Sequence, residues 1–160
     1  MDMDTVSDLL RQKPDPQLHA VSPDTTVAYA VCLMNYHGVG AVLVMKEDRL
    51  EGIFTERDVL QRVVEPNRDP GATAVHEVMT PKPRTIKAGD RVARVLDIMA
   101  RGKFRHLPVM TGTGVVGVLS MRDLNAWLIR KLVSPDDNPD DSAVALAKSM
   151  GAAKPGRKSV

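Results

Sequence analysis

Gly52-Ile53-Phe54-Thr55-Glu56-Arg57-Asp58 returns 65 residues later as Gly117-Val118-Leu119-Ser120-Met121-Arg122-Asp123. Both heptapeptides begin with glycine and two apolar residues, and both continue with a hydroxyl residue, a variable residue and Arg-Asp. Around them, residues 22–60 align on residues 87–125 without a gap. Self-similarity at a fixed spacing marks a repeated structural unit, so the chain contains one unit twice.

Each copy shows the same order of helical and extended patterns. Apolar residues recur at helical spacing: Val27, Ala30, Val31 and Met34 in the first copy, and Val92, Val95, Leu96 and Met99 in the second. Strands are expected at 41–45 and 50–54, and again at 106–110 and 115–119, with a polar turn inside each pair. A second helix begins at Thr55 or Ser120 and ends before Pro66 or Pro135. With a short extended piece in front, at 18–21 or 84–86, each unit has the order β-α-β-β-α.

The segments outside the repeat set the expected boundaries. Residues 6–10 and 75–79 resemble short helical lead-ins, and residues 66–74 are rich in Pro, Asn, Asp and Gly. We therefore expect a first domain over 4–65, a linker over 66–74 and a second domain over 75–133. Residues 134–160 change to Pro, Asp, Ser, Ala and Gly, which predicts a disordered tail.

Length and composition exclude several classes of protein. A chain of 160 residues has room for two small units but not for a large catalytic fold. No apolar stretch approaches the roughly 20 residues of a membrane-spanning helix, the acidic N-terminus has no secretory pattern, and Cys32 has no partner for an internal disulfide. A net charge of +2 is too small to indicate nucleic-acid binding. We expect a cytoplasmic protein without a membrane span.

Two β-α-β-β-α units that each carry Gly-apolar-apolar-Thr/Ser-x-Arg-Asp resemble the CBS (cystathionine β-synthase) domain pair, also called a Bateman module. The resemblance extends over about residues 4–132 and includes Arg105-His106-Leu107-Pro108-Val109 and Val78-Met79-Thr80-Pro81. It implies a mixed α/β (α+β) fold in which the two units are related by pseudo-twofold symmetry. It also implies an adenine-containing ligand such as AMP, ADP, ATP, NAD(H) or S-adenosylmethionine, bound in clefts between the units.

The resemblance also implies roles for individual residues. Thr55 and Ser120 would contact phosphate, and Asp58 and Asp123 would hold the ribose hydroxyls. Main chain near Thr80, Ile86 and the strand from His106 to Pro108 would read the adenine, with Ala41 and Val42 at the matching place in the first copy. Arg57, Arg105, His106 and Arg122 would neutralise phosphate charge. The chemistry of helix N-termini agrees, because unpaired N–H groups and the helix dipole favour a phosphate there.

Structural roles compete with these functional ones. Thr-x-x-Asp or Ser-x-x-Asp at a helix start also forms a helix cap, and both roles can hold together. His106 is compatible with a structural histidine, and Arg57 and Arg122 with pairing to acids on their own helices. The methionines occupy core spacings, and the four histidines show no spacing typical of a metal site.

We therefore expect a regulatory nucleotide sensor that acts on a partner protein, forms a homodimer and has neither a catalytic cofactor nor enzymatic activity. The alternative is an accessory for nucleic-acid or protein interaction without a small-molecule ligand. We also expect two unequal clefts. Arg105-His106 stands in the second copy where the first has Gly40-Ala41, which favours the cleft at the second copy's motif. If His106 instead crosses to the ligand of the first copy, the ranking of the clefts changes but their inequality remains.

Overall fold

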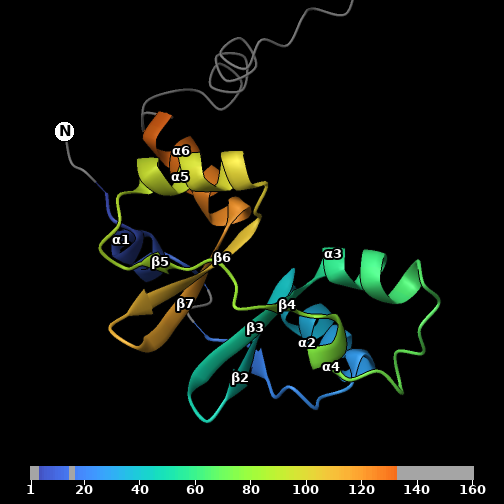
Figure 1. The fold of residues 1–160 in the computed structure, drawn as a ribbon. Coiled ribbons are helices and arrows are strands. Elements are labelled where there is room, and N and C mark those ends of the chain that lie inside the picture. Colours follow the sequence, from blue (N-terminus) through green and yellow to red (C-terminus); the bar gives the residue numbers. More distant parts are fainter. Residues whose placement is uncertain (1–3, 15–16, 133–160) are drawn as a thin grey trace, which may run out of the picture. The chain divides into compact units, whose positions relative to one another are not determined.

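The computed structural model describes residues 4–14 and 17–132. The chain divides into two compact units, residues 1–124 and 125–160. The expected disordered tail over 134–160 lies outside the described residues. Along the chain the elements are α1 (Val6–Arg11), β1 (Ala20–Val21), α2 (Val27–His37), β2 (Ala41–Lys46), β3 (Arg49–Thr55), α3 (Glu56–Asp58), the π-helical segment η1 (Val59–Val64), α4 (Val75–Val78), β4 (Thr80–Pro81), β5 (Ile86–Lys87), α5 (Val92–Gly102), β6 (His106–Thr111), β7 (Gly114–Ser120) and α6 (Met121–Leu132) (Figure 1).

Each repeat builds its own sheet around the expected hairpin. The first sheet has the order β1-β2-β3-β4 and the second has the order β5-β6-β7. In both, the short leading strand lies parallel to the next strand, and the hairpin strands are antiparallel. Even the irregularity in register repeats, between Val44 and Met45 in one hairpin and between Val109 and Met110 in the other. The predicted β-α-β-β-α unit is thus present twice.

Two details differ from the sequence expectation. Residues 80–81, where the sequence analysis predicts no strand, form β4 and pair with Gly52 and Ile53 of β3. The second helix of the first repeat is α-helical only over Glu56–Asp58 and continues as η1.

The hairpin turn between β2 and β3 consists of Glu47 and Asp48, both at positive φ (48° and 62°), as a two-residue type I′ turn requires.

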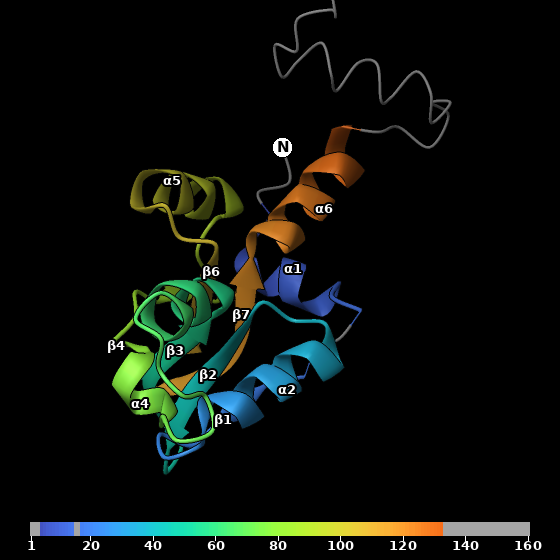
Figure 2. The same cartoon turned by 90° about the vertical axis from the view of Figure 1, so that its right-hand side faces the viewer.

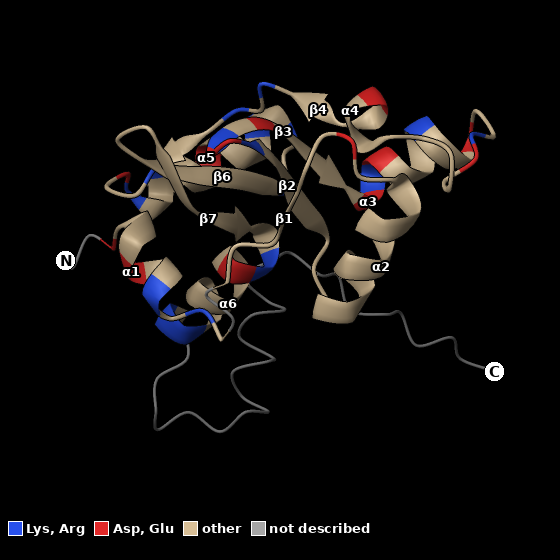
Figure 3. Ribbon diagram, turned by 90° about the horizontal axis from the view of Figure 1, so that it is seen from below, with Lys and Arg blue, Asp and Glu red and all other residues tan. Residues whose placement is uncertain are grey.

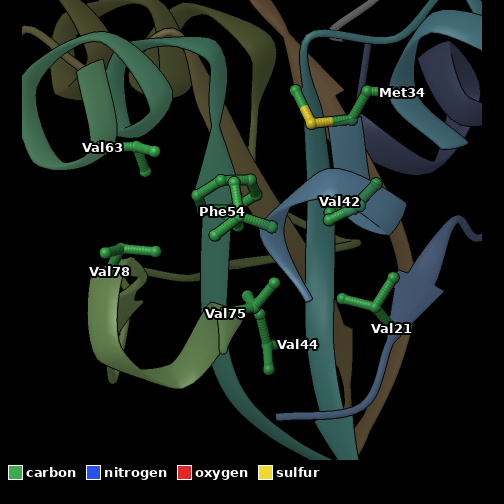
Figure 4. Packing of buried hydrophobic residues seen from close by; sticks show 10 residues of the cluster. Val21, Met34, Val42, Val44, Phe54, Val63, Val75 and Val78 are labelled. Atoms are coloured by element: carbon green, nitrogen blue, oxygen red, sulfur yellow. The ribbon is translucent and has the colours of Figure 1, made fainter. Parts of the chain in front are cut away.

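The first repeat has an aliphatic core with a single aromatic side chain. Phe54 is fully buried, and Met34, Val42, Val44 and Val63 pack in the same cluster (Figure 4). Val75 and Val78, which come from the lead-in helix α4 of the second repeat, complete it. Burial of such side chains contributes roughly 1.5–3 kcal/mol each, so α4 is a structural part of the first repeat.

The lead-in helices are exchanged between the repeats. Val75 N–H donates to the Thr25 carbonyl at 2.8 Å, which holds α4 on the first repeat. Val6 N–H donates to the Asp90 carbonyl at 2.9 Å, which holds α1 on the second repeat. Thr25 and Asp90 are 65 residues apart, so the same bond is made twice with the helices swapped. Val6 and Leu9 of α1 are both buried.

The remaining face of the first sheet contacts the second repeat. Ala41, Leu43 and Ile53 form a small buried cluster, against which Val115 and Val118 of β7 pack. This contact places the ends of β2 and β3 next to β7 and the start of α6, where both heptapeptides lie.

Among the described residues, no helix has the length and the apolar character that a membrane span requires.

Candidate functional site

One cavity lies at the heptapeptide of the second repeat. Cavity 1 has a volume of about 330 Å³. Ser120, Met121, Arg122 and Asp123 line it from the second repeat, together with Arg105, His106 and Val118. The first repeat and the segment before it provide the other lining residues: Lys13, Pro14, Gln17, His19, His37, Gly38, Val39, Gly40, Ala41 and Glu56.

Cavity 2 lies at the heptapeptide of the first repeat and has a volume of about 250 Å³. Thr55, Glu56, Arg57 and Asp58 line it from one side. The other lining residues are Gly40, Ile53, Gln61, Arg62, Thr80, Pro83, Arg84, Gly102, Lys103, Phe104, Arg105, His106 and Leu107. Both cavities are thus built from a helix start of one repeat and a strand start of the other.

Both heptapeptides form a reciprocal helix cap. Thr55 donates through its amide and its hydroxyl to Asp58 Oδ2, both at 2.9 Å, and Asp58 N–H donates back to Thr55 Oγ1 at 3.3 Å. Ser120 makes the same bonds to Asp123 Oδ2, both at 2.8 Å, with 3.2 Å for the return bond. The predicted capping role is therefore present in both repeats.

A third reciprocal cap, a Thr-x-x-Asp sequence like that of the first repeat, lies outside cavities 1 and 2. Thr5 and Asp8 form the same reciprocal cap at the start of α1. Neither residue lines cavity 1 or cavity 2. What distinguishes the heptapeptides is that their capping residues themselves line a cavity, whereas α1 borders a third cavity of about 330 Å³ only through Ser7, Leu10 and Arg11.

The two motif carboxylates have different surroundings. Lys13 Nζ lies 3.2 Å from Asp123 Oδ2 and donates to the Val118 carbonyl at 2.8 Å. Asp58, only 6% exposed, faces Arg62 NH1 at 3.5 Å. Arg62 also donates to the carbonyls of Val78 and Met79, so it ties η1 to the chain after α4. Each carboxylate uses one oxygen for its cap and is already close to a cation.

His106 lines both cavities. Burial lowers the pKa of His106, and the charge of Arg105 lowers it further. The carboxylates of Glu56 and Asp123 act in the opposite direction, and Lys13 adds a small lowering contribution. The lowered pKa favours the neutral imidazole near pH 7, a ring with one donor and one acceptor.

Each cavity combines the heptapeptide of one repeat with residues that the sequence analysis named in the other repeat. Ala41 of the first repeat lies in cavity 1 with Ser120 and Asp123, whereas Thr80 lies in cavity 2 with Thr55 and Asp58. Arg105 and His106, expected at the second copy's cleft, line both cavities. The reason is topological, because each strand start adjoins the helix start of the other repeat.

Of the other residues named from the sequence, two arginines line the cavities and three strand residues do not. Arg122 lines cavity 1, and Arg57 lines cavity 2 while donating to the Lys103 carbonyl at 3.3 Å. The side chains of Val42, Ile86 and Pro108 are buried in strands and line neither cavity.

Several lining residues had no signal in the sequence. The rings of His19 and His37 are stacked with centroids 4.1 Å apart, although the residues are 18 positions apart in the chain. Lys13 lies in a loop outside the repeat, and Glu56 occupies the variable position of the heptapeptide, where the second copy has Met121. Within residues 4–14 and 17–132, no three His, Cys, Asp or Glu side chains gather as a metal-binding group.

Comparisons with known proteins agree on one family. The sequence profile of the CBS domain matches residues 6–65 and 75–130. A mitochondrial CBS domain-containing protein of Arabidopsis thaliana is 33% identical over 128 residues, which is 75% of this chain and 62% of that protein. The chain spans only 16–20% of two other curated relatives that it matches.

Solved structures extend the likeness to the fold. A protein with CBS domains from Burkholderia ambifaria has a TM-score of 0.78 at 34% identity, covering 84% of this chain and all of that one. A CBS domain protein from Pyrobaculum aerophilum, solved in complex with AMP, has a TM-score of 0.68 at 25% identity and covers 79% of this chain and 97% of that one. Two matched profiles, a shared tandem fold and two heptapeptides beside two cavities lead to one conclusion: the chain belongs to the CBS-domain family, as a tandem pair.

Proposed function

We propose that the chain is a regulatory module that binds adenine nucleotides in cavities 1 and 2 and acts on a partner protein. The observation that carries the proposal is the repeated combination of a capped helix start, its Asp and nearby arginines around a cavity. Volumes of about 330 and 250 Å³ are close to the lower end of the range of small-molecule sites. The AMP complex of the Pyrobaculum aerophilum protein supports an adenosine-type ligand.

The chemistry around each Asp supports a ribose site. Oδ2 of Asp58 and of Asp123 is occupied by cap bonds, so Oδ1 is the oxygen that a ribose diol would meet. The hydroxyls of Thr55 and Ser120 donate to these carboxylates, so a phosphate contact from them requires the hydroxyl to rotate. The cations that line cavity 2 are Arg57, Arg62, Arg84, Lys103 and Arg105, and those that line cavity 1 are Lys13, Arg105 and Arg122. Arg62 and Lys13 already lie near the motif carboxylates.

We further propose that the module has no catalytic activity of its own, works in the cytoplasm and forms a homodimer. The family is built of ligand-binding units, and none of the described cavity residues forms a nucleophile with a base in the arrangement that catalysis needs. The mitochondrial Arabidopsis thaliana relative makes location a point to test by fractionation.

The ligand is tested by thermal-shift screening of the full chain against AMP, ADP, ATP, NAD(H) and S-adenosylmethionine, followed by calorimetry. A ligand at a hundred times its Kd raises the free energy of unfolding by about 2.7 kcal/mol, which gives a clear shift in melting temperature. Stabilisation by at least one of these compounds is the expected result. No shift with any of them at millimolar concentration contradicts the proposal.

A further inference from the structure

Cavities 1 and 2 are separated by a wall that they share. Four residues line both: Gly40, Glu56, Arg105 and His106. We call these residues the shared wall. Gly40 and Arg105 occupy equivalent places in the two repeats, because Glu56 N–H donates to the Gly40 carbonyl and Met121 N–H donates to the Arg105 carbonyl in the same way, at 3.1 and 2.9 Å.

The shared wall is one side chain thick. A methyl carbon added to Gly40 would lie 3.1 Å from Glu56 Oε1 and 3.2 Å from His106 Nε2. The carboxylate and the imidazole therefore converge on the same point above the glycine backbone. Glycine leaves the space in which these two groups meet.

The charges on the shared wall cannot serve two ligands independently. Among the four residues of the shared wall, Arg105 alone carries a permanent positive charge, and Glu56 carries a negative charge. His106, whose pKa is lowered by burial, offers one N–H donor while neutral. When a phosphate in one cavity binds the donors of Arg105 and His106, a ligand in the other cavity meets only the carboxylate of Glu56 on the shared wall. The negative charge of the first phosphate, on the other side of this thin wall, also repels the second phosphate.

We infer that the two cavities are negatively coupled for ligands that carry phosphates, so that one nucleotide per chain binds tightly and the second binds at least about tenfold more weakly than it would to an empty chain. This inference rests on the proposed nucleotide-binding function and goes beyond it. It differs from a mere inequality of the cavities, because the weakening depends on the first cavity being occupied.

The test uses variants in which one cavity is filled. Met121→Trp fills cavity 1 and Gln61→Trp fills cavity 2, because each side chain lines only that cavity and is at least partly exposed. Calorimetry with ADP gives the affinity of cavity 2 in the first variant and of cavity 1 in the second. In the unmodified chain the first ADP should bind with the better of these two constants. The second should bind at least about tenfold more weakly than the poorer one.

Arg105→Ala and Arg84→Ala form a matched pair of controls. Arg105 lines both cavities, so its removal should weaken ADP binding about tenfold in both filled variants. Arg84 lines cavity 2 only, so its removal should weaken binding in Met121→Trp and leave Gln61→Trp within about twofold. Two ADP constants in the unmodified chain that equal the two single-cavity constants overturn the coupling but leave the proposed function intact. If no ADP binds to any form, the proposed function fails and the coupling with it.

Discussion

Asp58 and Asp123 occupy equivalent positions but differ in how deeply they are built into the fold. Asp58 is 6% exposed, and its removal would take away the carboxylate that Arg62 faces. The Asp123 side chain is 16% exposed, and its partner Lys13 is 23% exposed. We predict that Asp123→Ala weakens nucleotide binding in cavity 1 but lowers the melting temperature by only a few degrees, because the lost cap costs about 1 kcal/mol.

Asp58→Ala is the comparison for that experiment. It should weaken binding in cavity 2 and lower the melting temperature more than Asp123→Ala does, because a buried carboxylate with a nearby cation is removed. Calorimetry and thermal denaturation of the two variants measure both effects. An Asp123→Ala protein that binds nucleotide normally but melts far earlier would show that the carboxylate only caps the helix.

His106 should take up a proton when a phosphate binds. In the free protein its pKa is lowered by burial and by Arg105, with Glu56 and Asp123 opposing and Lys13 adding a little, so the ring is neutral near pH 7. A bound phosphate raises this pKa, and binding therefore strengthens as the pH falls from 8 toward 6 and levels off below the pKa of the free ring.

The measurement is made on Met121→Trp, because His106 is the only histidine among the described residues that line cavity 2, whereas His19 and His37 also line cavity 1. Calorimetry in buffers of different ionisation enthalpy should show proton uptake on ADP binding near pH 6.5. His106→Gln should abolish most of the uptake. An unchanged uptake in this variant would assign the proton to another group.

At the scale of elements, the glycines that open the two heptapeptides have different neighbours. A methyl carbon on Gly52 would lie 2.9 Å from the Thr80 carbonyl oxygen of β4 and would clash with the Met79 sulfur, whereas one on Gly117 would lie 3.0 Å from a methyl group of Leu10. Backbone cannot move aside as a leucine side chain can. We predict that Gly52→Ala lowers the free energy of unfolding by about 1–3 kcal/mol and that Gly117→Ala has a smaller effect, measured by urea denaturation. Equal losses would mean that Leu10 is as fixed as β4.

Helix α2 has an exposed apolar stripe that α5 lacks. Tyr29 and Tyr36 are 62% and 84% exposed, and Cys32 lies between them on the same face. Figure 3 shows α2 without a charged residue, whereas the equivalent residues of α5 are Arg94, Asp97 and Arg101, with Arg94 paired to Asp90 and Arg101 to Asp97. The apolar faces that the sequence predicted are buried in both helices, through Val27, Ala30 and Met34 in α2 and Val92, Val95 and Met99 in α5, so the exposed stripe of α2 is an additional feature.

If the proposed homodimer forms through α2, a charge on this stripe should prevent it. We predict a mass of about twice 17.5 kDa in light scattering at micromolar concentration, and a shift to the monomer in Tyr36→Glu, because burial of an unpaired carboxylate opposes association. Arg101→Glu, the matched change on α5, should leave the dimer intact. A dimer lost in Arg101→Glu but kept in Tyr36→Glu would move the interface to the second repeat.

At the scale of the whole molecule, the exchange of lead-in helices makes the two repeats depend on each other. Figure 2 shows α4 beside the first sheet, where Val75 and Val78 join the core. We predict that a fragment of residues 1–70 and a fragment of residues 71–160 are each poorly folded alone, since each lacks the helix that covers its sheet. Mixed in equal amounts, they should regain the circular dichroism spectrum of the intact chain. A stable fold of either fragment by itself would contradict this.

The sequence predicted the fold well because the repeat revealed each element twice. Hairpins, helices and the lead-in helices follow from periodicity and from Gly and Pro positions, which are local signals. The crossed grouping in the cavities was considered only for His106, because which strand start adjoins which helix start depends on how the sheets pack. The same long-range packing brings Lys13, His19 and His37 to cavity 1. Strand β4 forms because α4, which directly precedes it, packs on the first repeat and so places residues 80–81 beside β3.

The exchange also has a consequence during synthesis. The six-residue helix α1 is synthesised before the second repeat, but Val6 and Leu9 are buried only on that repeat, whose strand β7 ends at Ser120. At 5–20 residues per second, α1 waits roughly 5–20 s for its partner surface. During that interval its two buried residues are exposed on the nascent chain, next to Asp8 and Arg11, whose charges oppose contact with other apolar surfaces. The first repeat waits a shorter time, because its missing helix α4 follows it directly, so on the ribosome the first repeat closes before the second.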